Sequence, residues 1–271
     1  MPRPSIPDGD FSPGVSRSGG IKAKAAINSA AIWASDWTPD APQQQVLAVG
    51  SPVSYWVANT PRKDWSVICP DDRTIRVELH KDDQYISAAW TDSTTTERNE
   101  LYYADITSPN LDKAYQVTNG TPCVFEVDIT KRDANIYAAQ WMVLVQVFAN
   151  GSNGSGLGSP PIELSLASDD NKFGIVLRNN AAESYPWAMS EPWERNETHR
   201  FRIEWTLNSN QTGTVKVYWD GEQVVNFSGT VGHTGQASQE FAMGIYRRES
   251  NEAAAFDFKV IGVRVGDHST F

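Results

Sequence analysis

The chain is short of cysteine, of histidine and of positive charge, and each shortage narrows what it can do. Its 271 residues include two cysteines and four histidines, so neither a disulfide framework nor a Cys/His zinc site is expected. Whether Cys69 and Cys123, each next to a proline, form a bond is left open. Acidic residues outnumber basic ones by 33 to 23, giving a net charge of −10. Because nucleic-acid binding needs a positive field, we expect no nucleic-acid partner.

We also expect neither a membrane span nor an export leader. No stretch approaches the roughly 18 apolar residues that cross a bilayer, so we expect no membrane association. The first ten residues, MPRPSIPDGD, hold no apolar segment of the signal-peptide type.

What the chain does contain is one strand pattern after another. Residues 74–80 alternate apolar and polar side chains, with Ile75, Val77 and Leu79 on one face. Further period-two runs follow at 124–129, 201–205, 214–219, 222–227 and 256–265. Asp220-Gly221 between two of these runs is a hairpin signal. No capped amphipathic helix of twelve or more residues is evident, and the closest candidate, 21–34, is ambiguous between helix and edge strand. We predict an all-β jelly-roll sandwich of two antiparallel sheets.

Length and the continuity of the strand patterns indicate one folded domain. An all-β chain of this size is commonly a single domain. We expect residues 41–271 to form it, and residues 1–40 to be irregular, wrapping the sandwich or partly disordered. The Gly/Ser-rich stretch 151–159 has strand patterns on both sides, so it is interpreted as a loop within the domain, placed to act as a lid.

Three short strand-type segments stand out because each places polar groups on one face. They are Arg98-Asn99-Glu100-Leu101, Gln146-Val147-Phe148 and FAMGIYR at 241–247. Residues two apart in a strand share a face. The pairs expected to point together are Arg98 with Glu100, Gln146 with Phe148, and Tyr246 with Arg248. If the three strands lie in one sheet, an arginine, a carboxylate, an amide and a phenol line one concave surface, which suits a polymeric sugar that carries carboxylates.

The same segments carry a family resemblance. The chain resembles the jelly-roll polysaccharide lyases, which are the alginate lyases and the related glucuronan and heparin lyases. Alginate lyases of this type carry Arg-(Ser/Thr)-Glu-(Leu/Val)-Arg, Gln-(Ile/Val)-His and Tyr-Phe-Lys-x-Gly-x-Tyr segments, in that order. The matching stretches here are RNELY at 98–102, QVF at 146–148 and EFAMGIY at 240–246. Supporting pieces at 76–79, 160–164 and 219–221 resemble the glucuronan and heparin lyase branch. The resemblance spans residues 65–265 and implies a concanavalin-like jelly roll with an acidic polysaccharide as its partner.

The resemblance implies β-elimination at a uronic acid, in which the C5 proton is removed and the 4-O-glycosidic bond breaks. Gln146 and Arg98 would then stabilise the C5 carboxylate and its enolate, and Tyr246 would be the acid. A tyrosine also serves as the base if neighbouring arginines lower its pKa, which is near 10 when unperturbed. The remaining substrate contacts implied are Glu100, Tyr102, Arg76, Glu78, Arg248 and Phe148.

Departures from the motifs leave the identity of the base open. Phe148 stands where the family has its histidine, Ala242 where it often has a lysine, and Tyr102 where it has a second arginine. Three interpretations remain: Tyr246 is both base and acid, another histidine is the base, or catalysis is lost and a lectin-like sugar-binding domain remains. The histidine candidates are His80, which shares a face with Arg76 and Glu78, and then His199 and His233.

Cofactor, assembly and location are expectations from the substrate class. We expect no cofactor. Asp82-Asp83 and Asp169-Asp170-Asn171 offer oxygen ligands for a structural calcium ion, but neither matches a known calcium loop. We expect a monomer that acts outside the cell. A bacteriophage virion adhesin or depolymerase, released by lysis without a signal peptide, is the alternative.

Overall fold

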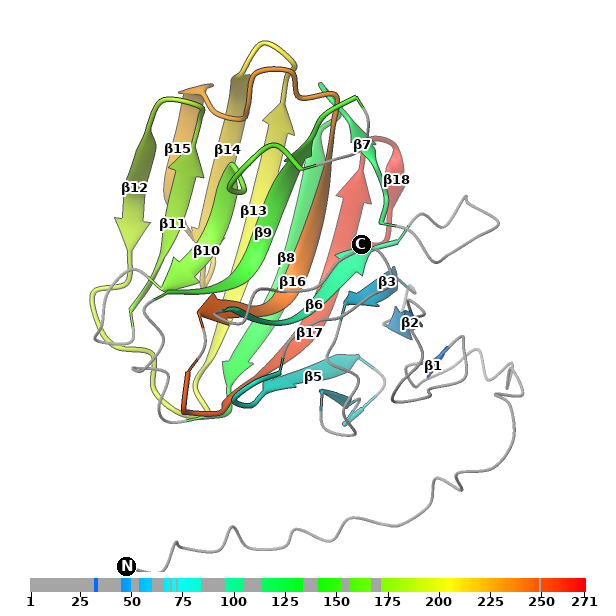
Figure 1. Cartoon of the computed structure of the whole chain (residues 1–271), viewed down its shortest axis with the longest axis vertical. Coiled ribbons are helices and arrows are strands. Elements are labelled where there is room, and N and C mark those ends of the chain that lie inside the picture. Colours follow the sequence, from blue (N-terminus) through cyan, green and yellow to red (C-terminus); the bar gives the residue numbers. More distant parts are fainter. Residues whose placement is uncertain are drawn as a thin grey trace, which may run out of the picture.

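The computed structural model describes twelve stretches of the chain. They are residues 32–33, 45–49, 54–59, 66–68, 70–71, 73–83, 96–104, 114–133, 141–152, 156–166, 172–248 and 250–271. Across these stretches the secondary structure is entirely β, arranged as two antiparallel sheets packed face to face (Figure 1). The all-β prediction is therefore confirmed. No helix long and apolar enough to cross a membrane occurs among the described residues.

The first sheet, sheet A, holds the three polar segments. Its strand order is β1 (Ile32–Trp33), β2 (Gln45–Val49), β3 (Ser54–Asn59), β6 (Thr96–Tyr103), β16 (Ser238–Arg248), β9 (Met142–Asn150), β10 (Ile162–Leu166), β11 (Phe173–Arg178) and β12 (Glu183–Ala188). The short β7 (Val117–Thr118) also pairs with β16.

The second sheet, sheet B, lies behind sheet A in Figure 1. Its order is β15 (Glu222–Thr230), β14 (Thr212–Trp219), β13 (Thr198–Leu207), β8 (Cys123–Lys131), β17 (Ala254–Val265), β5 (Thr74–Leu79) and β4 (Val67–Ile68), and β18 (His268–Ser269) pairs with β17.

The alternation read from the sequence is the alternation seen in the sheets. In β5 the apolar residues Ile75, Val77 and Leu79 are fully buried, whereas the polar residues between them are not. The β14–β15 hairpin turns through Asp220 and Gly221, both with positive φ (52° and 85°), as the Asp-Gly pair predicts. The burial pattern of β5 shows why such a strand forms: its apolar face is buried against the other sheet.

The core between the sheets is rich in aromatic rings. Trp56 packs edge-on against Tyr103 and Phe241, with ring centroids 5.6 and 5.9 Å away. Trp193 fills the same role further along the sandwich and is fully buried. Cys123 also lies in the core with a free thiol, and burial raises its pKa to about 12. Cys69 lies outside the described residues.

One ion pair is buried in this apolar core. Arg247 on β16 donates from Nε to Glu97 Oε2 on β6 at 2.7 Å, and neither side chain has any exposed surface. The other carboxylate oxygen of Glu97 accepts a hydrogen bond from the backbone N–H of Asp82 at 2.8 Å. Burial raises the pKa of Glu97, an effect that Arg247 partly offsets. Glu97 and Arg247 are direct partners in the β6–β16 register, so the pair ties these two strands together.

Several sequence predictions fall on parts of the chain that the structure does not describe. Most of the segment 1–40 and of the helix candidate 21–34 lies there, although Ile32–Trp33 within both forms strand β1. The calcium candidate at 169–171 also lies outside the described residues. In the loop 151–159, residues 153–155 are undescribed, and Gly156 forms an isolated bridge with Asn150.

Replacing Arg247 by methionine is expected to lower the free energy of unfolding by about 3–5 kcal/mol, because the Glu97 carboxylate would stay buried without its partner. Urea unfolding followed by tryptophan fluorescence measures the loss. The double variant Glu97→Leu with Arg247→Met removes both charges and should recover most of it. A loss below about 1 kcal/mol, the value typical of a surface pair, would contradict this expectation.

Candidate functional site

The three polar segments of the sequence lie on neighbouring strands at the centre of sheet A. Strand β16 runs between β6 and β9. Arg98 is the direct partner of Tyr246 in the β6–β16 register, and Gln146 is the partner of Ala242 in the β16–β9 register. The condition that the sequence could only assume, that all three strands share one sheet, is therefore met.

The candidate side chains point away from the core, on what we call the outer face of sheet A. Leu101 on β6 is fully buried in the core, and Asn99 on the same side donates to the backbone oxygen of Glu78 in sheet B at 2.9 Å. By the alternation of a strand, Arg98 and Glu100 face the opposite way.

A network of contacts links these side chains through the Glu100 carboxylate. Arg98 Nη1 lies 3.2 Å from Glu100 Oε2 and also donates to the Tyr102 hydroxyl oxygen at 3.2 Å. The other carboxylate oxygen, Oε1, accepts a hydrogen bond from Gln146 Nε2. The Arg98 guanidinium lies over the ring of Tyr246, 4.1 Å from its centroid. Thus a single carboxylate positions both the arginine and the amide.

This network is largely withdrawn from solvent. Glu100 and Gln146 are 2% and 1% exposed, and Arg98 and Tyr102 are 8% exposed each. Burial is also the largest reason that the pKa of Tyr102 is raised well above its usual range, and the Glu100 charge adds to it. Tyr102 therefore stays a neutral phenol at physiological pH and is a poor candidate for the base.

One buried acceptor in the network lacks a partner. Gln146 Oε1 has no hydrogen-bond partner in the structure, as judged over the part of the chain described. Leaving a buried polar atom unsatisfied costs about 1–3 kcal/mol. Such an atom beside an arginine and a phenol is a reason to look for a bound ligand that would donate to it.

Gly244 lets β6 and β16 approach closely beside the network. Its φ is +143°, and a Cβ at this position would lie 2.7 Å from Glu100 Cα and closer still to the Asn99 carbonyl oxygen. The β16–β9 register shifts between Met243 and Tyr246, which marks a bulge at this glycine. The glycine of the Gly-x-Tyr segment therefore determines the position of Tyr246 relative to the neighbouring strands.

The three positions at which the chain departs from the motifs lie close together. Phe148 stacks on Tyr102 with ring centroids 5.6 Å apart and ring planes 22° apart. Ala242 belongs to the same small apolar cluster, together with Ala104. A largely buried apolar cluster, in which Phe148 stays partly exposed, thus stands where the motifs have the histidine, the lysine and the second arginine.

Other residues predicted for the site lie in sheet B. Arg76 on β5 pairs with Asp257 at 2.7 Å. Glu78 on the same strand pairs with His80 Nε2 at 2.5 Å. These three residues share a face, as the alternation predicted, but it is the outer face of the second sheet. The structure does not bring them together with Tyr246.

The remaining candidates are placed as follows. Arg248 is exposed at the end of β16, next to the buried Arg247. His199 on β13 in sheet B contacts Asp220 Oδ2 at 2.6 Å. His233 follows β15 and lies 2.7 Å from the backbone oxygen of Ser159.

Sequence reasoning missed an acidic residue on the outer face of sheet A. Glu163 on β10 is the direct partner of Gln146 and is 6% exposed. Its carboxylate lies 2.7 Å from Arg178 Nη1, and Arg178 also pairs with Glu183. Burial raises the pKa of Glu163, against the opposing effect of Arg178. Glu163 could have been recognised from the sequence, because it lies between Ile162 and Leu164 just as Gln146 lies in an apolar run.

Trp141, just before β9, is a second residue that the motifs do not include. Its ring meets that of Tyr246 edge-on, with centroids 4.8 Å apart and planes at 69°. Together with the guanidinium of Arg98, it fixes the orientation of the Tyr246 ring.

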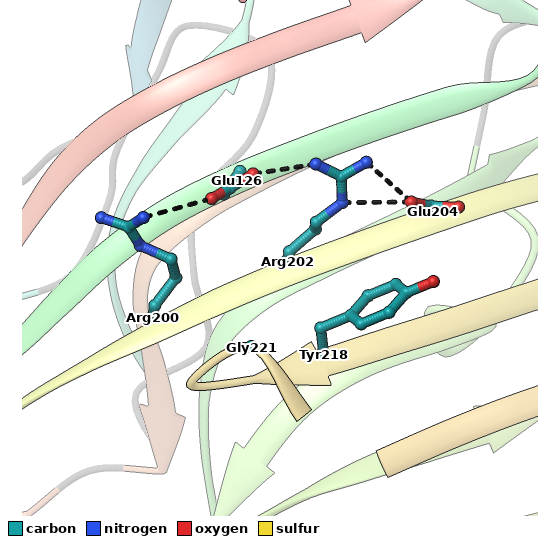
Figure 2. Close-up of a pocket in the computed structure, with 6 residues that line it drawn as sticks. All are labelled: Glu126, Arg200, Arg202, Glu204, Tyr218 and Gly221. Atoms are coloured by element: carbon teal, nitrogen blue, oxygen red, sulfur yellow. Dashed lines mark hydrogen bonds and ion pairs between the residues drawn. The ribbon is translucent and has the colours of Figure 1, made fainter. Parts of the chain in front are cut away.

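The outer face of sheet B also carries a cavity, of about 310 Å³, but its charges are used internally. Figure 2 shows the residues that line it, Glu126, Arg200, Arg202, Glu204, Tyr218 and Gly221. Arg202 pairs with Glu126 at 3.0 Å and with Glu204 at 2.7 Å, and Arg200 pairs with Asp128 at 2.7 Å. We interpret this row as ion pairs that stabilise the sheet, two of them between β13 and β8 and one within β13.

Potential metal ligands are not grouped in the described stretches. No cluster of three or more His, Cys, Asp or Glu side chains suited to a metal occurs there. Of the calcium candidate Asp82-Asp83, the Asp83 carboxylate accepts a hydrogen bond from the backbone N–H of His80 at 2.7 Å.

Comparison with known proteins gives a family and a fold. Residues 36–265 match the model of a family described as polysaccharide lyase. The chain is similar to the solved alginate lyase A1-II', a member of polysaccharide lyase family 7, with 9% identity and a TM-score of 0.56 over 76% of this chain and 86% of that one. Curated protein sequences give no match.

Two further solved structures show the same likeness. Alginate lyase AlgAT5, from polysaccharide lyase family 7, is 13% identical with a TM-score of 0.52 over 75% of this chain and 84% of that chain. Alginate lyase PA1167 from Pseudomonas aeruginosa is 13% identical with a TM-score of 0.52 over 84% and 99%. At such identities the shared feature is the fold, and it confirms the jelly-roll prediction.

Gly244→Ala is expected to destabilise the protein more than Gly158→Ala does. Both glycines have positive φ, which costs about 1–3 kcal/mol for another residue, but only at Gly244 would the added Cβ also collide with the neighbouring strand. The two free energies of unfolding, measured in urea, give the comparison. Equal losses would show that β6 and β16 can move apart at Glu100 without cost.

Proposed function

The chain belongs to the polysaccharide lyase family, and on that premise we propose that it cleaves a uronic-acid polymer by β-elimination on the outer face of sheet A. The observation that carries this proposal is the group formed across β6, β16 and β9. In this group Arg98, Gln146 and Tyr246 are brought together from three separate motifs.

We assign the substrate carboxylate to Arg98 and Gln146. β-Elimination requires that charge on the C5 carboxylate, and on the enolate formed from it, be stabilised. An arginine and an amide suit that task. Their attachment to Glu100 holds them in position before substrate arrives, which lowers the entropy cost of binding. The unpartnered Gln146 Oε1 is available to accept a hydrogen bond from a sugar hydroxyl.

Tyr246 is assigned to both proton transfers. A guanidinium 4.1 Å from its ring centroid stabilises negative charge on the phenol oxygen. The phenolate takes the C5 proton, the C4–O4 bond breaks as the C4–C5 double bond forms, and the same proton then passes to O4 of the departing sugar. Protons and electron pairs balance between Tyr246 and the substrate. His80 directly follows β5 and His199 lies on β13, both strands of sheet B, which favours the tyrosine over either of these two histidines as the base.

Sugar binding without catalysis is the second candidate function. It is favoured by Phe148 at the position of the motif histidine and by the low exposure of Glu100 and Gln146. A protein of this kind would retain the Arg98–Gln146 pair and hold a carboxylate without abstracting the proton. Activity measurements separate the two candidates directly.

Tyr246→Phe is expected to reduce kcat by a factor on the order of 10²–10⁴, because one positioned group would lose both proton transfers. The assay follows absorbance of the unsaturated uronate near 235 nm, from pH 6 to 10, on alginate, glucuronan, heparin-type and hyaluronan polymers. For the wild type we expect the rate to rise toward alkaline pH, since the phenolate is the reactive form.

Tyr218→Phe is the matched control, because Tyr218 lies at the sheet B cavity and should retain full activity. If the wild type produces no absorbance change on any polymer, yet is retarded by one of them in affinity electrophoresis, the lyase proposal is wrong. The second candidate function, sugar binding without catalysis, would then take its place.

A further inference from the structure

The outer face of sheet A carries an apolar patch directly beside the proposed carboxylate site. We define the patch as Tyr102, Phe148, Ala242 and Ala104. Tyr102, Ala242 and Gln146 are consecutive partners across β6, β16 and β9, so the patch begins one strand from the Gln146 amide. Phe148 keeps part of its ring surface exposed and is the accessible member of the patch, whereas Tyr102 is 8% exposed and both alanines are fully buried beneath it.

The charges that the strands of sheet A present on this face do not form a positive field. Five of the ten strands, β1, β2, β3, β7 and β9, contain no charged residue at all. The others contribute to the outer face three arginines and four glutamates, which are Arg98, Arg178, Arg248, Glu100, Glu163, Glu183 and Glu240. The strands therefore have one more negative than positive charge on this face, on a chain whose net charge is −10.

The arginines of this face are also largely committed to its own carboxylates. Arg98 pairs with Glu100 at 3.2 Å, and Arg178 pairs with Glu163 at 2.7 Å. Glu240, the β16 residue opposite Phe148, is held by Asn150 Nδ2 at 2.9 Å and by Gln116 Nε2 at 3.2 Å. Next to the patch, then, the sheet offers amides and a carboxyl group, with its nearest arginine already bound to Glu100.

A polymer made only of uronates fits this surface poorly. It brings one carboxylate with every sugar, so the sugar next to the reacting one would place its charge over the patch. That charge would lie near the Glu240 carboxyl group opposite Phe148, beside an arginine that is already paired with Glu100, and like charges repel. An uncharged sugar avoids that repulsion and covers apolar ring surface with its C–H face.

We infer that the natural substrate is a heteropolysaccharide in which each uronate is flanked by uncharged sugars. The single carboxylate of the cleavage site is bound by Arg98 and Gln146, and the uncharged neighbour packs on the exposed part of the Phe148 ring, against which Tyr102 stacks. The inference rests on the proposed lyase function and adds the substrate class. It also explains the three motif departures together. With Tyr102, Phe148 and Ala242 in place of the arginine, histidine and lysine of the motifs, a single patch lacks three basic side chains.

The decisive experiment compares polymers that share one uronate. Glucuronan consists of glucuronate alone, whereas hyaluronan and unsulfated chondroitin alternate glucuronate with an N-acetylhexosamine. At equal glucuronate concentration we expect kcat/KM to be at least ten times higher on one of the alternating polymers than on glucuronan or alginate. An equal or higher value on the polyuronates would overturn the inference.

The substrate class can still be tested if the protein has no lyase activity. If no polymer yields an absorbance change, the proposed function fails, and affinity electrophoresis of the wild type on the same polymers tests the substrate class. Stronger retardation by an alternating polymer supports the inference. Equal or stronger retardation by glucuronan, or no retardation by any of them, overturns it.

A pair of substitutions tests the patch itself. Phe148→Lys places a cation on it and should raise kcat/KM on glucuronan several-fold, a gain that should disappear in 0.5 M salt because the attraction is electrostatic. Phe148→Met keeps the surface apolar and should give no such gain. Urea unfolding of both variants shows that they are folded. An unchanged ratio of glucuronan to hyaluronan activity, or of affinity if catalysis is absent, in a folded Phe148→Lys protein would contradict the role of the patch.

Discussion

The arrangement of the site depends on the register between β6 and β16. Glu97 pairs with Arg247 on the buried side of these strands, and the adjacent pair, Arg98 with Tyr246, lies on the outer side. A slip of one residue would exchange the two faces, burying the site and exposing the ion pair. A buried ion pair is rarely a large net source of stability, but leaving either charge unpaired is costly. The core contact therefore selects the one register in which the arginine lies over the phenol.

The polar network on the outer side is built ahead of any ligand. Glu100 accepts from Arg98 and Gln146, so both donors are oriented by a residue that need not touch the sugar. Burial strengthens each of these contacts and makes unsatisfied atoms expensive, as at Gln146 Oε1. The cost is recovered only when a ligand supplies the missing partner. Rigid strands, and a glycine that brings two of them close together, hold this geometry more firmly than loops would.

Much of the fold and the centre of the site could be predicted from local pattern. Alternation identified which residues of β5 face the core, and the order of three short motifs indicated that Arg98, Gln146 and Tyr246 belong together. Alternation gives the face of a strand and not the sheet to which it belongs, so Arg76 and His80 were grouped with a site that lies in the other sheet. Glu163 was overlooked although it interrupts an apolar run just as Gln146 does. The sheet to which a strand belongs is decided by its pairing with strands distant in the sequence, and a local pattern does not contain that information.

The strand order of sheet A also determines when the site can exist. Strand β16 lies between β6 and β9, yet it is synthesised long after both of them. Until the ribosome has delivered it, β6 and β9 have no common neighbour, and each exposes an unpaired edge. Contacts between such distant segments make folding slow and leave the nascent chain open to association with other chains. Because β16 lies near the end of the chain and at the centre of sheet A, the site assembles only when synthesis of the chain is nearly complete.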